Sequence, residues 1–145
     1  MVEQLSVFLE NEAGRLAKMC RVLADTGHNM RVLMVADTAE YGVARVLCDR
    51  PHAARRALEE AGFAVSITPV VAVEVPDRPG GLAEVLEALG GADVNVEYLY
   101  CYVRPDAAAA VDIFRVEDPA AASSVLGQAG FAMVRAAEIY ELDPA

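Results

Sequence analysis

The chain has 145 residues, of which 55% are hydrophobic and 23% charged, and this is enough apolar material for a globular core. Residues 1–69 carry 8 basic and 9 acidic groups and residues 70–145 carry 4 and 13, so neither half has the cationic surface that nucleic acid binding requires. No segment approaches the roughly 18 apolar residues of a membrane span, and the start of the chain lacks a signal peptide pattern, so we expect a cytoplasmic protein with no membrane partner.

The chain begins with a predicted strand and helix. Apolar and polar residues alternate from Leu5 to Leu9, which predicts the strand. A glycine-bearing turn follows, and an apolar face at helical spacing then predicts a helix that ends at Gly27. That face consists of Leu16, Met19, Cys20 and Leu23.

A hairpin and a second helix come next. Residues 30–36 and 43–48 are rich in β-forming residues and predict the two strands of the hairpin. The turn between them carries Asp37, Thr38, Tyr41 and Gly42. Pro51 fits the first position of a helix, where a missing N–H is tolerated, and this helix runs to Gly62. Residues 63–68 then predict a closing strand.

The second half of the chain is a copy of the first. A shift of 66 residues superposes Val7 on Val73, Gly14 on Gly80, Leu16 on Leu82, Ala17 on Ala83, Leu23 on Leu89 and Asn29 on Asn95. Farther along, the shift becomes 68 because the second copy has gained two residues near 104–110. This shift superposes Val43 on Val111, Pro51 on Pro119, Leu58 on Leu126, and the two AGFA segments at 61–64 and 129–132.

The copy predicts the same elements in the same order. A strand at 71–75 precedes a helix that ends near Gly90 and Gly91. Two β-rich stretches at 94–103 and 110–116 form the second hairpin. Its turn carries Arg104, Pro105 and Asp106. The last predicted elements are a helix with Asp118 as N-cap and Pro119 at its first position, ending at Gly130, and a strand over 131–142.

The order strand, helix, strand, strand, helix, strand occurs twice, which predicts an α+β protein of two ferredoxin-like units. In each unit the helices cover one face of an antiparallel sheet. The predicted domains are residues 1–69 and 70–145, and the boundary near Thr68 and Pro69 has no linker character. A domain of about 70 residues is small. We therefore expect the other unit and a homodimer mate to cover its remaining faces.

The sequence offers no catalytic or metal site. Cys20, Cys48 and Cys101 lie in apolar segments without a CxxC pattern, which indicates buried, reduced thiols. His28 and His52 stand alone and have no counterpart in the other copy, which favours surface or helix-terminal positions. We therefore expect no enzyme activity, no metal and no cofactor.

Three tyrosines share one face of a predicted strand in the second copy. They are Tyr98, Tyr100 and Tyr102. An aromatic row on a sheet face is typical of a packed interface with a partner domain or a dimer mate. Ligand stacking on these rings is the alternative.

The turns between the opening strands and the first helices resemble those of the ACT domain family, which consists of small amino-acid-sensing regulatory modules. The family signature is Asp/Asn-x-Pro-Gly-x-Leu, followed by a Gly-x-Asn-like entry to the next strand. The second copy matches it with Asp77, Arg78, Pro79, Gly80, Gly81, Leu82 and Asn95. The first copy has alanine where the family has proline, and its residues are Asn11, Glu12, Ala13, Gly14, Arg15, Leu16 and Asn29. The two copies together cover nearly the whole chain.

This resemblance implies a tandem ACT protein that holds a free amino acid, or a similar small metabolite, at these turns between paired domains. Glycine permits close approach of the backbone, and the first amides of the helix are unpaired donors for a carboxylate. The amides of Asn11 and Asn29 suit an ammonium and carboxylate pair. Asp77 would repel a carboxylate, so we predict that the amino acid binds at the first turn. Asn95 keeps the second turn as a candidate site. The alternative is that these glycines and asparagines only shape the turns.

Two functions therefore remain open. One is a small-molecule sensor whose rearranged surface regulates a metabolic enzyme or another regulator. The other is a constitutive interaction subunit of a metabolic enzyme, with no ligand of its own. Neither copy carries a catalytic or DNA-binding segment, so in both cases the output passes through a partner protein. Thermal stabilisation by free amino acids distinguishes the two.

Overall fold

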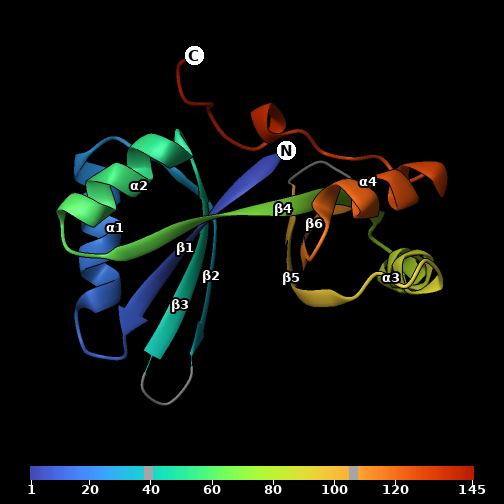
Figure 1. Ribbon diagram of the computed structural model, residues 1–145, viewed down its shortest axis with the longest axis horizontal. Helices are drawn as coiled ribbons and strands as arrows, with labels where there is room; N and C mark the ends of the chain where they lie inside the picture. Colours follow the sequence, from blue (N-terminus) through green and yellow to red (C-terminus); the bar gives the residue numbers. More distant parts are fainter. Residues whose placement is uncertain (38–40, 105–107) are drawn as a thin grey trace. The chain divides into compact units, whose positions relative to one another are not determined.

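The computed structural model describes residues 1–37, 41–104 and 108–145. In the first half of the chain the elements are β1 (Val2–Glu10), α1 (Arg15–Asp25), β2 (Met30–Asp37), β3 (Tyr41–Cys48), α2 (Pro51–Glu60) and β4 (Ala64–Pro76) (Figure 1). In the second half they are α3 (Gly81–Gly91), β5 (Val96–Val103), β6 (Ala109–Val116), α4 (Pro119–Gln128) and the short 3-10 helix η1 (Ala136–Glu138). Thr38, Pro105 and Asp106 of the predicted hairpin turns lie outside the described residues. No described helix is both long and apolar enough to span a bilayer.

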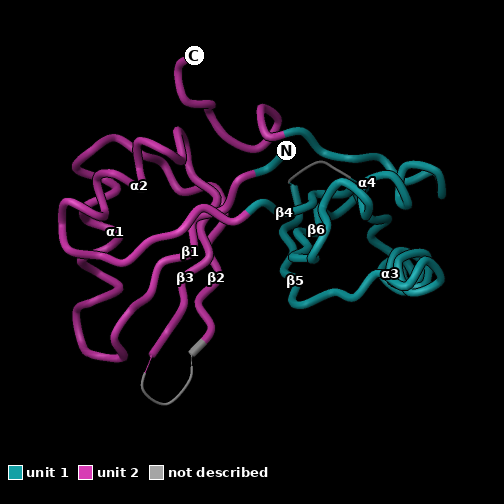
Figure 2. The backbone as a smooth tube through the Cα atoms, in the orientation of Figure 1, with its two compact units in different colours: residues 1–2, 69–135 teal, residues 3–68, 136–145 magenta. Residues whose placement is uncertain are grey.

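The chain forms two compact units, which Figure 2 shows in different colours. The N-terminal unit contains residues 3–68 and 136–145, and the C-terminal unit contains residues 1–2 and 69–135. The thirteen residues of β4 contribute to both units, because the division falls between Thr68 and Pro69. The predicted domains, 1–69 and 70–145, describe the sequence repeats, and these limits stay a prediction.

The strands of both units follow the ferredoxin-like order, with four strands in the N-terminal unit and three in the C-terminal unit. In the N-terminal unit the order is β2-β3-β1-β4, with Leu5 of β1 opposite Val46 of β3. In the C-terminal unit it is β4-β6-β5, with Val71 of β4 opposite Phe114 of β6. Both hairpins contain a bulge at the same place, after Met30 in β2 and after Val96 in β5. The predicted α+β fold with two ferredoxin-like units is confirmed.

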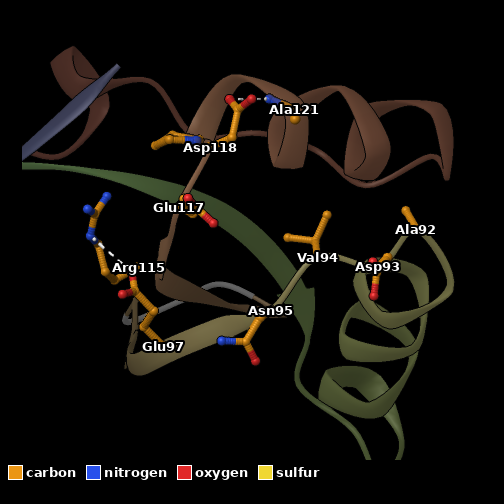
Figure 3. Close-up of a pocket in the computed structure, with 10 residues that line it drawn as sticks. Ala92, Asp93, Val94, Asn95, Glu97, Arg115, Glu117, Asp118 and Ala121 are labelled. Carbon is orange, nitrogen blue, oxygen red and sulfur yellow. Dashed lines mark hydrogen bonds and ion pairs between the residues drawn. The ribbon is translucent and has the colours of Figure 1, made fainter.

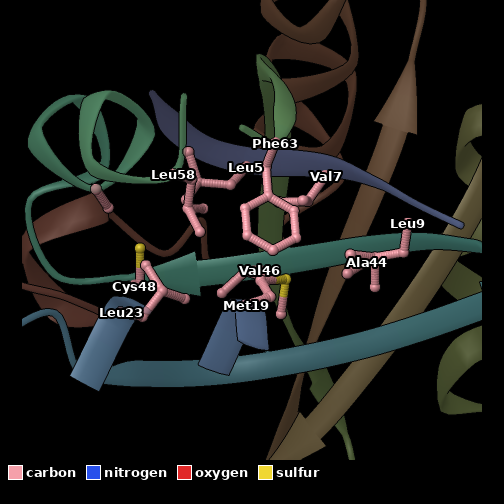
Figure 4. Close-up of a cluster of buried hydrophobic side chains, with 11 residues drawn as sticks. Leu5, Val7, Leu9, Met19, Leu23, Ala44, Val46, Cys48, Leu58 and Phe63 are labelled. Carbon is pink, nitrogen blue, oxygen red and sulfur yellow. The ribbon is translucent and has the colours of Figure 1, made fainter. Parts of the chain in front are cut away.

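The core of each unit lies between its helices and one face of its sheet. In the N-terminal unit, Leu5, Val7 and Leu9 alternate along β1 and pack against α1 and α2. Because strand side chains alternate between faces, Phe8 between them points away and is 55% exposed. Figure 4 shows this cluster, to which the helices contribute Met19, Leu23, Ala54 and Leu58. The corresponding cluster of the C-terminal unit is built from Val71, Val73, Val75, Val85, Leu89, Phe114, Val116, Ala122 and Leu126.

The predicted last strand, 131–142, is wrong for most of its length. Met133 forms one isolated bridge with Val73, and the backbone then turns into η1. The backbone beyond η1 pairs with the N-terminal unit, where the N–H of Arg50 donates to the carbonyl of Glu141 at 2.7 Å. The N–H of Glu3 donates to the Tyr140 hydroxyl at 2.9 Å. These hydrogen bonds take the place of the backbone pairing that a longer strand would have formed with β4.

The C-terminal segment supplies the N-cap that α2 lacks. Arg50 precedes α2 with a left-handed backbone and no capping side chain. Both carboxylate oxygens of Asp143 instead accept hydrogen bonds, one from the N–H of His52 and one from the N–H of Ala53, each at 3.0 Å. In α4, Asp118 caps its own helix as predicted, accepting from the N–H of Ala121 at 3.1 Å. The carboxylate of Asp143 thus satisfies helix donors 90 residues away in the sequence.

We predict that Asp143→Ala lowers the free energy of unfolding by about 1 kcal/mol, the usual cost of removing a helix N-cap. Urea unfolding of the full chain measures it. Asp118→Ala is the matched control for a local cap, and it should cost a similar amount. An unchanged urea midpoint for Asp143→Ala would mean that the segment does not hold α2 in solution.

The cysteines were predicted to be buried and the histidines to lie at the surface or at helix ends, and each prediction holds only in part, because Cys101 is exposed and His28 is buried. The three cysteines are free thiols, but Cys101 is exposed and Cys20 is half-buried. Burial raises the pKa of the third, Cys48, to about 12. His52 lies in the first turn of α2, as expected for a helix-terminal residue. His28 is buried, with Nδ1 at 3.0 Å from the carbonyl of Asp49, because the β3–α2 junction covers it.

Candidate functional site

The first turn, residues 11–14, leads from β1 into α1 and leaves the helix N-terminus uncapped. The N–H of Glu12 donates to the carbonyl of Glu10 at 2.8 Å, which closes the turn. Gly14 then takes φ 89°, a left-handed conformation that glycine adopts without strain, and starts the helix without a side-chain cap. The first helical amides and the helix dipole therefore face a surface that an anion can reach.

A small pocket adjoins this turn, and we call it the Asn11 pocket. Its volume is about 270 Å³. It is lined by Leu9, Glu10, Asn11, Glu12, Leu16, Val35 and Gly42. The lining combines the amide of Asn11 and the carboxylates of Glu10 and Glu12 with two apolar side chains. These are Leu16 and Val35, which are 39% and 43% exposed. Both polar and apolar parts of a small metabolite would find partners here.

The other predicted residues of the first turn do not line the Asn11 pocket. Ala13 and Gly14 are exposed. The guanidinium of Arg15 lies 4.5 Å from the ring centroid of Phe63, and the ammonium of Lys18 lies 5.5 Å from it. The charge of Arg15 is thus held over an aromatic ring of the core.

Asn29 lies at the opposite end of α1 from Asn11. It lines a second pocket of about 380 Å³, the Asn29 pocket, with Cys20, Leu23, Ala24, Gly27, His28 and Met30. The eleven residues of α1 separate the two asparagines by about 16 Å along the helix. One unit therefore does not bring Asn11 and Asn29 to a common ligand.

The second turn, residues 77–80, repeats the backbone of the first. The N–H of Arg78 donates to the carbonyl of Pro76 at 2.9 Å, and Gly80 takes φ 87° before α3. The guanidinium of Arg78 folds onto α3 and donates to both carboxylate oxygens of Glu84, at 3.0 and 2.9 Å. Arg78 is the one cationic residue of the turn at 77–80, and this ion pair holds its guanidinium. Asp77 and Pro79 are exposed, and Leu82 is 36% exposed.

A buried carboxyl distinguishes the second unit, and the sequence analysis missed it. Asp112 of β6 is 3% exposed and lies opposite Cys101 of β5. Burial raises the pKa of Asp112, and a hydrogen bond from the Cys101 thiol lowers it in part. The shift of 68 residues places Asp112 on Ala44, so this charge in an apolar position was visible in the repeat alignment. Burial raises the pKa of the Cys101 thiol, and the negative charges of Asp112 and Asp77 raise it further.

Asn95 lines the largest of these pockets, the Asn95 pocket, at the far end of α3 from the second turn (Figure 3). Its volume is about 900 Å³. The lining comes from two junctions, α3–β5 and β6–α4, and consists of Ala92, Asp93, Val94, Asn95, Glu97, Arg115, Glu117, Asp118, Pro119 and Ala121. Arg115 pairs with Glu97 at 3.3 Å. The second copy therefore also keeps its asparagine apart from its turn.

Comparison with known proteins gives the following matches. A family model described as ACT domain pair matches residues 1–142. The crystal structure of protein BT0572 from Bacteroides thetaiotaomicron has 35% sequence identity and a TM-score of 0.90, over 97% of this chain and 96% of that one. No curated protein sequence matches the chain.

Two further solved structures are similar in fold. The ligand-free regulatory subunit of aspartate kinase from Thermus thermophilus has 19% identity and a TM-score of 0.63, over 88% of this chain and 92% of that one. The regulatory subunit from Thermus flavus has 17% identity and a TM-score of 0.58, over 88% and 91%. At these identities the likeness concerns the fold.

Proposed function

The chain belongs to the ACT domain pair family, and from this premise we propose that it is a non-catalytic regulatory protein that binds a free amino acid at the turn between β1 and α1. The family match spans residues 1–142, so both copies take part in it. The ligand would change the surface of the domain pair, and that surface would regulate a partner protein.

The Asn11 pocket is the observation that carries this proposal. The uncapped first turn of α1 offers backbone N–H donors and a favourable dipole to an α-carboxylate. Glu10 and Glu12 offer acceptors to an α-ammonium, and Asn11 can serve either group. Leu16 and Val35 remain for the side chain of the amino acid. The pocket is near the lower end of the size range of small-molecule sites, which fits one amino acid.

The second turn is less suited to the same ligand. Asp77 takes the place of Asn11, and the buried carboxyl of Asp112 takes the place of Ala44. Asp77 places a carboxylate where the amide of Asn11 could hold the α-carboxylate, and Asp112 adds a buried carboxyl to the same unit. Arg78 does not offset them, because its guanidinium is paired with Glu84. Binding at the residues from Asp77 to Leu82 is therefore the weaker part of the proposal.

The proposal also includes the location, the oligomeric state and the partner of the protein. We expect a cytoplasmic homodimer in which a neighbouring domain completes the Asn11 pocket and contributes the asparagine that a single unit keeps at the far end of α1. A metabolic enzyme or another regulator would receive the signal. The same fold in the regulatory subunit of aspartate kinase from Thermus thermophilus supports a partner of this kind.

Melting temperatures of the purified full chain, measured with each of the twenty amino acids, test the proposal. We expect one amino acid or a few related ones to raise the melting temperature, since a ligand at one hundred times its Kd adds about 2.7 kcal/mol. No rise with any amino acid would contradict it and favour an interaction subunit without a ligand.

Asn11→Ala should weaken binding of the stabilising amino acid about tenfold, the loss of roughly one hydrogen bond to a charged group. Isothermal titration measures this affinity. Gln128→Ala removes an exposed amide at the end of α4, far from the pocket in sequence, and should leave the affinity unchanged. Equal affinity for wild type and Asn11→Ala would remove the Asn11 pocket from the proposal.

A further inference from the structure

In the N-terminal unit, an extended segment of the chain lies against the β3–α2 junction. The carboxylate of Asp49 accepts from the N–H of Glu141 at 2.8 Å, and the N–H of Arg50 donates to the carbonyl of Glu141 at 2.7 Å. The carboxylate of Asp143 then caps α2 at Ala53. Hydrogen bonds with Asp49, Arg50 and Ala53 therefore hold this segment at the junction.

The equivalent junction of the C-terminal unit is open and forms the Asn95 pocket. The repeat alignment and the shared position of the bulges make the residues correspond one to one. Glu117 corresponds to Asp49, Asp118 to Arg50, and Ala121 to Ala53, all at a shift of 68. All three line the pocket. The place that holds a peptide segment in one unit is thus a cavity of about 900 Å³ in the other.

The charges of the two junctions differ. In the N-terminal unit Arg31 donates two hydrogen bonds to Asp49, at 3.1 and 2.9 Å. Glu97 stands in the place of Arg31, so two acidic residues replace this ion pair in the Asn95 pocket. Arg115 pairs with Glu97. Within the described ranges Glu117 and Asp93 take part in no ion pair, which leaves a surplus of negative charge.

We propose that the Asn95 pocket binds an extended segment of a partner protein that carries lysine or arginine. Glu117 accepts a main-chain N–H of that segment, as Asp49 does for Glu141, and the acidic lining receives its cationic side chains. The acidic C-terminal segment of a second copy does not fit, because Glu141 and Asp143 would meet like charges. Asp118 already caps α4, so the incoming segment needs no carboxylate of its own.

This site is separate from the proposed amino acid site. None of its lining residues belongs to the first turn or to the Asn11 pocket. It supplies the domain pair with a place at which a partner can be held. Loss of peptide binding would leave amino acid binding intact, so the two proposals fail independently.

The probe for the test is a blocked pentapeptide that copies the segment 139–143 with lysine in place of both acidic residues, acetyl-Ile-Tyr-Lys-Leu-Lys-amide. Titration of the full chain is followed by NMR chemical shifts and by calorimetry. We expect saturable binding with shifts centred on the amides of Asn95 and Glu117. The parent peptide, acetyl-Ile-Tyr-Glu-Leu-Asp-amide, should bind at least tenfold more weakly, because its charges are reversed.

Glu117→Gln should weaken binding of the lysine peptide about tenfold, since it removes one charge and one strong acceptor from the pocket. Glu87→Gln is the matched control, because it makes the same change at an exposed position of α3 outside the pocket. An equal effect of both variants would overturn the proposal in favour of unspecific attraction to an acidic protein. Absence of binding, or equally tight binding of free lysine, would overturn it as well.

Discussion

Gly81→Ala is expected to lower the free energy of unfolding by about 3 kcal/mol. A Cβ atom at Gly81 would lie 2.2 Å from the carbonyl oxygen of Pro76, which is far inside van der Waals contact. That oxygen is backbone, and it already accepts from the N–H of Arg78 at 2.9 Å. The turn must therefore open before α3 can begin. Urea unfolding of the two proteins measures the difference.

Gly90→Ala is the matched control, because Gly90 lies in the same helix and a Cβ there meets nothing within 4 Å. Alanine in a helix interior is favoured over glycine by roughly 1 kcal/mol, so this variant should be more stable than the wild type. If both variants moved the urea midpoint in the same direction, the close approach at Pro76 would not govern the second turn.

Asp49→Ala should destabilise the protein by roughly 2 kcal/mol. Asp49 is 5% exposed. Its carboxylate accepts hydrogen bonds from the guanidinium of Arg31 and from the N–H of Glu141. Its loss leaves the C-terminal segment without one of its anchors. We place the cost below that of a fully buried pair because the Arg31 side chain is 43% exposed and partly screened by water.

Glu117→Ala provides the control, because Glu117 corresponds to Asp49 in the second copy and is exposed. It should change the free energy of unfolding by less than about 0.5 kcal/mol. A loss at Glu117 as large as that at Asp49 would show that the ion pair and the C-terminal segment are not the source of the effect.

The stabilisation by Asp49 should also depend on pH. Burial alone would raise the pKa of Asp49, but the hydrogen bonds from Arg31 and Glu141 hold it below its usual value in the folded state. The stabilisation is therefore complete above the unfolded pKa, about 3.9, and is lost as the pH falls through the lower folded pKa. Urea midpoints of wild type and Asp49→Ala should converge below about pH 4. A constant difference down to pH 2 would contradict this linkage.

The local sequence pattern predicted part of the candidate site. The turns around Gly14 and Gly80 form as expected, because a left-handed glycine before an apolar helical face depends on adjacent residues only. Asn11 and Asn29 lie at opposite ends of α1, so their service to one ligand between paired domains stays a prediction. The burial of Asp112 was missed because a strand residue gains its surroundings from neighbouring strands, here Val73 of β4 and Cys101 of β5.

The sequence by itself determined the duplication, the order of elements up to α4 and the two glycine-bearing turns, because periodicity and turn residues act over a few positions. Tertiary structure alone decided where the C-terminal segment goes. Nothing near Ile139 in the sequence indicates that Tyr140, Glu141 and Asp143 will bond to residues about 90 to 137 positions earlier. The bonds to Tyr140 and Asp143 use donors that β1 and α2 leave unpaired, whereas the N–H of Glu141 itself donates to Asp49. They also make the two repeats, so alike in sequence, differ at their junctions: one is filled by the chain itself and the other is an open acidic pocket.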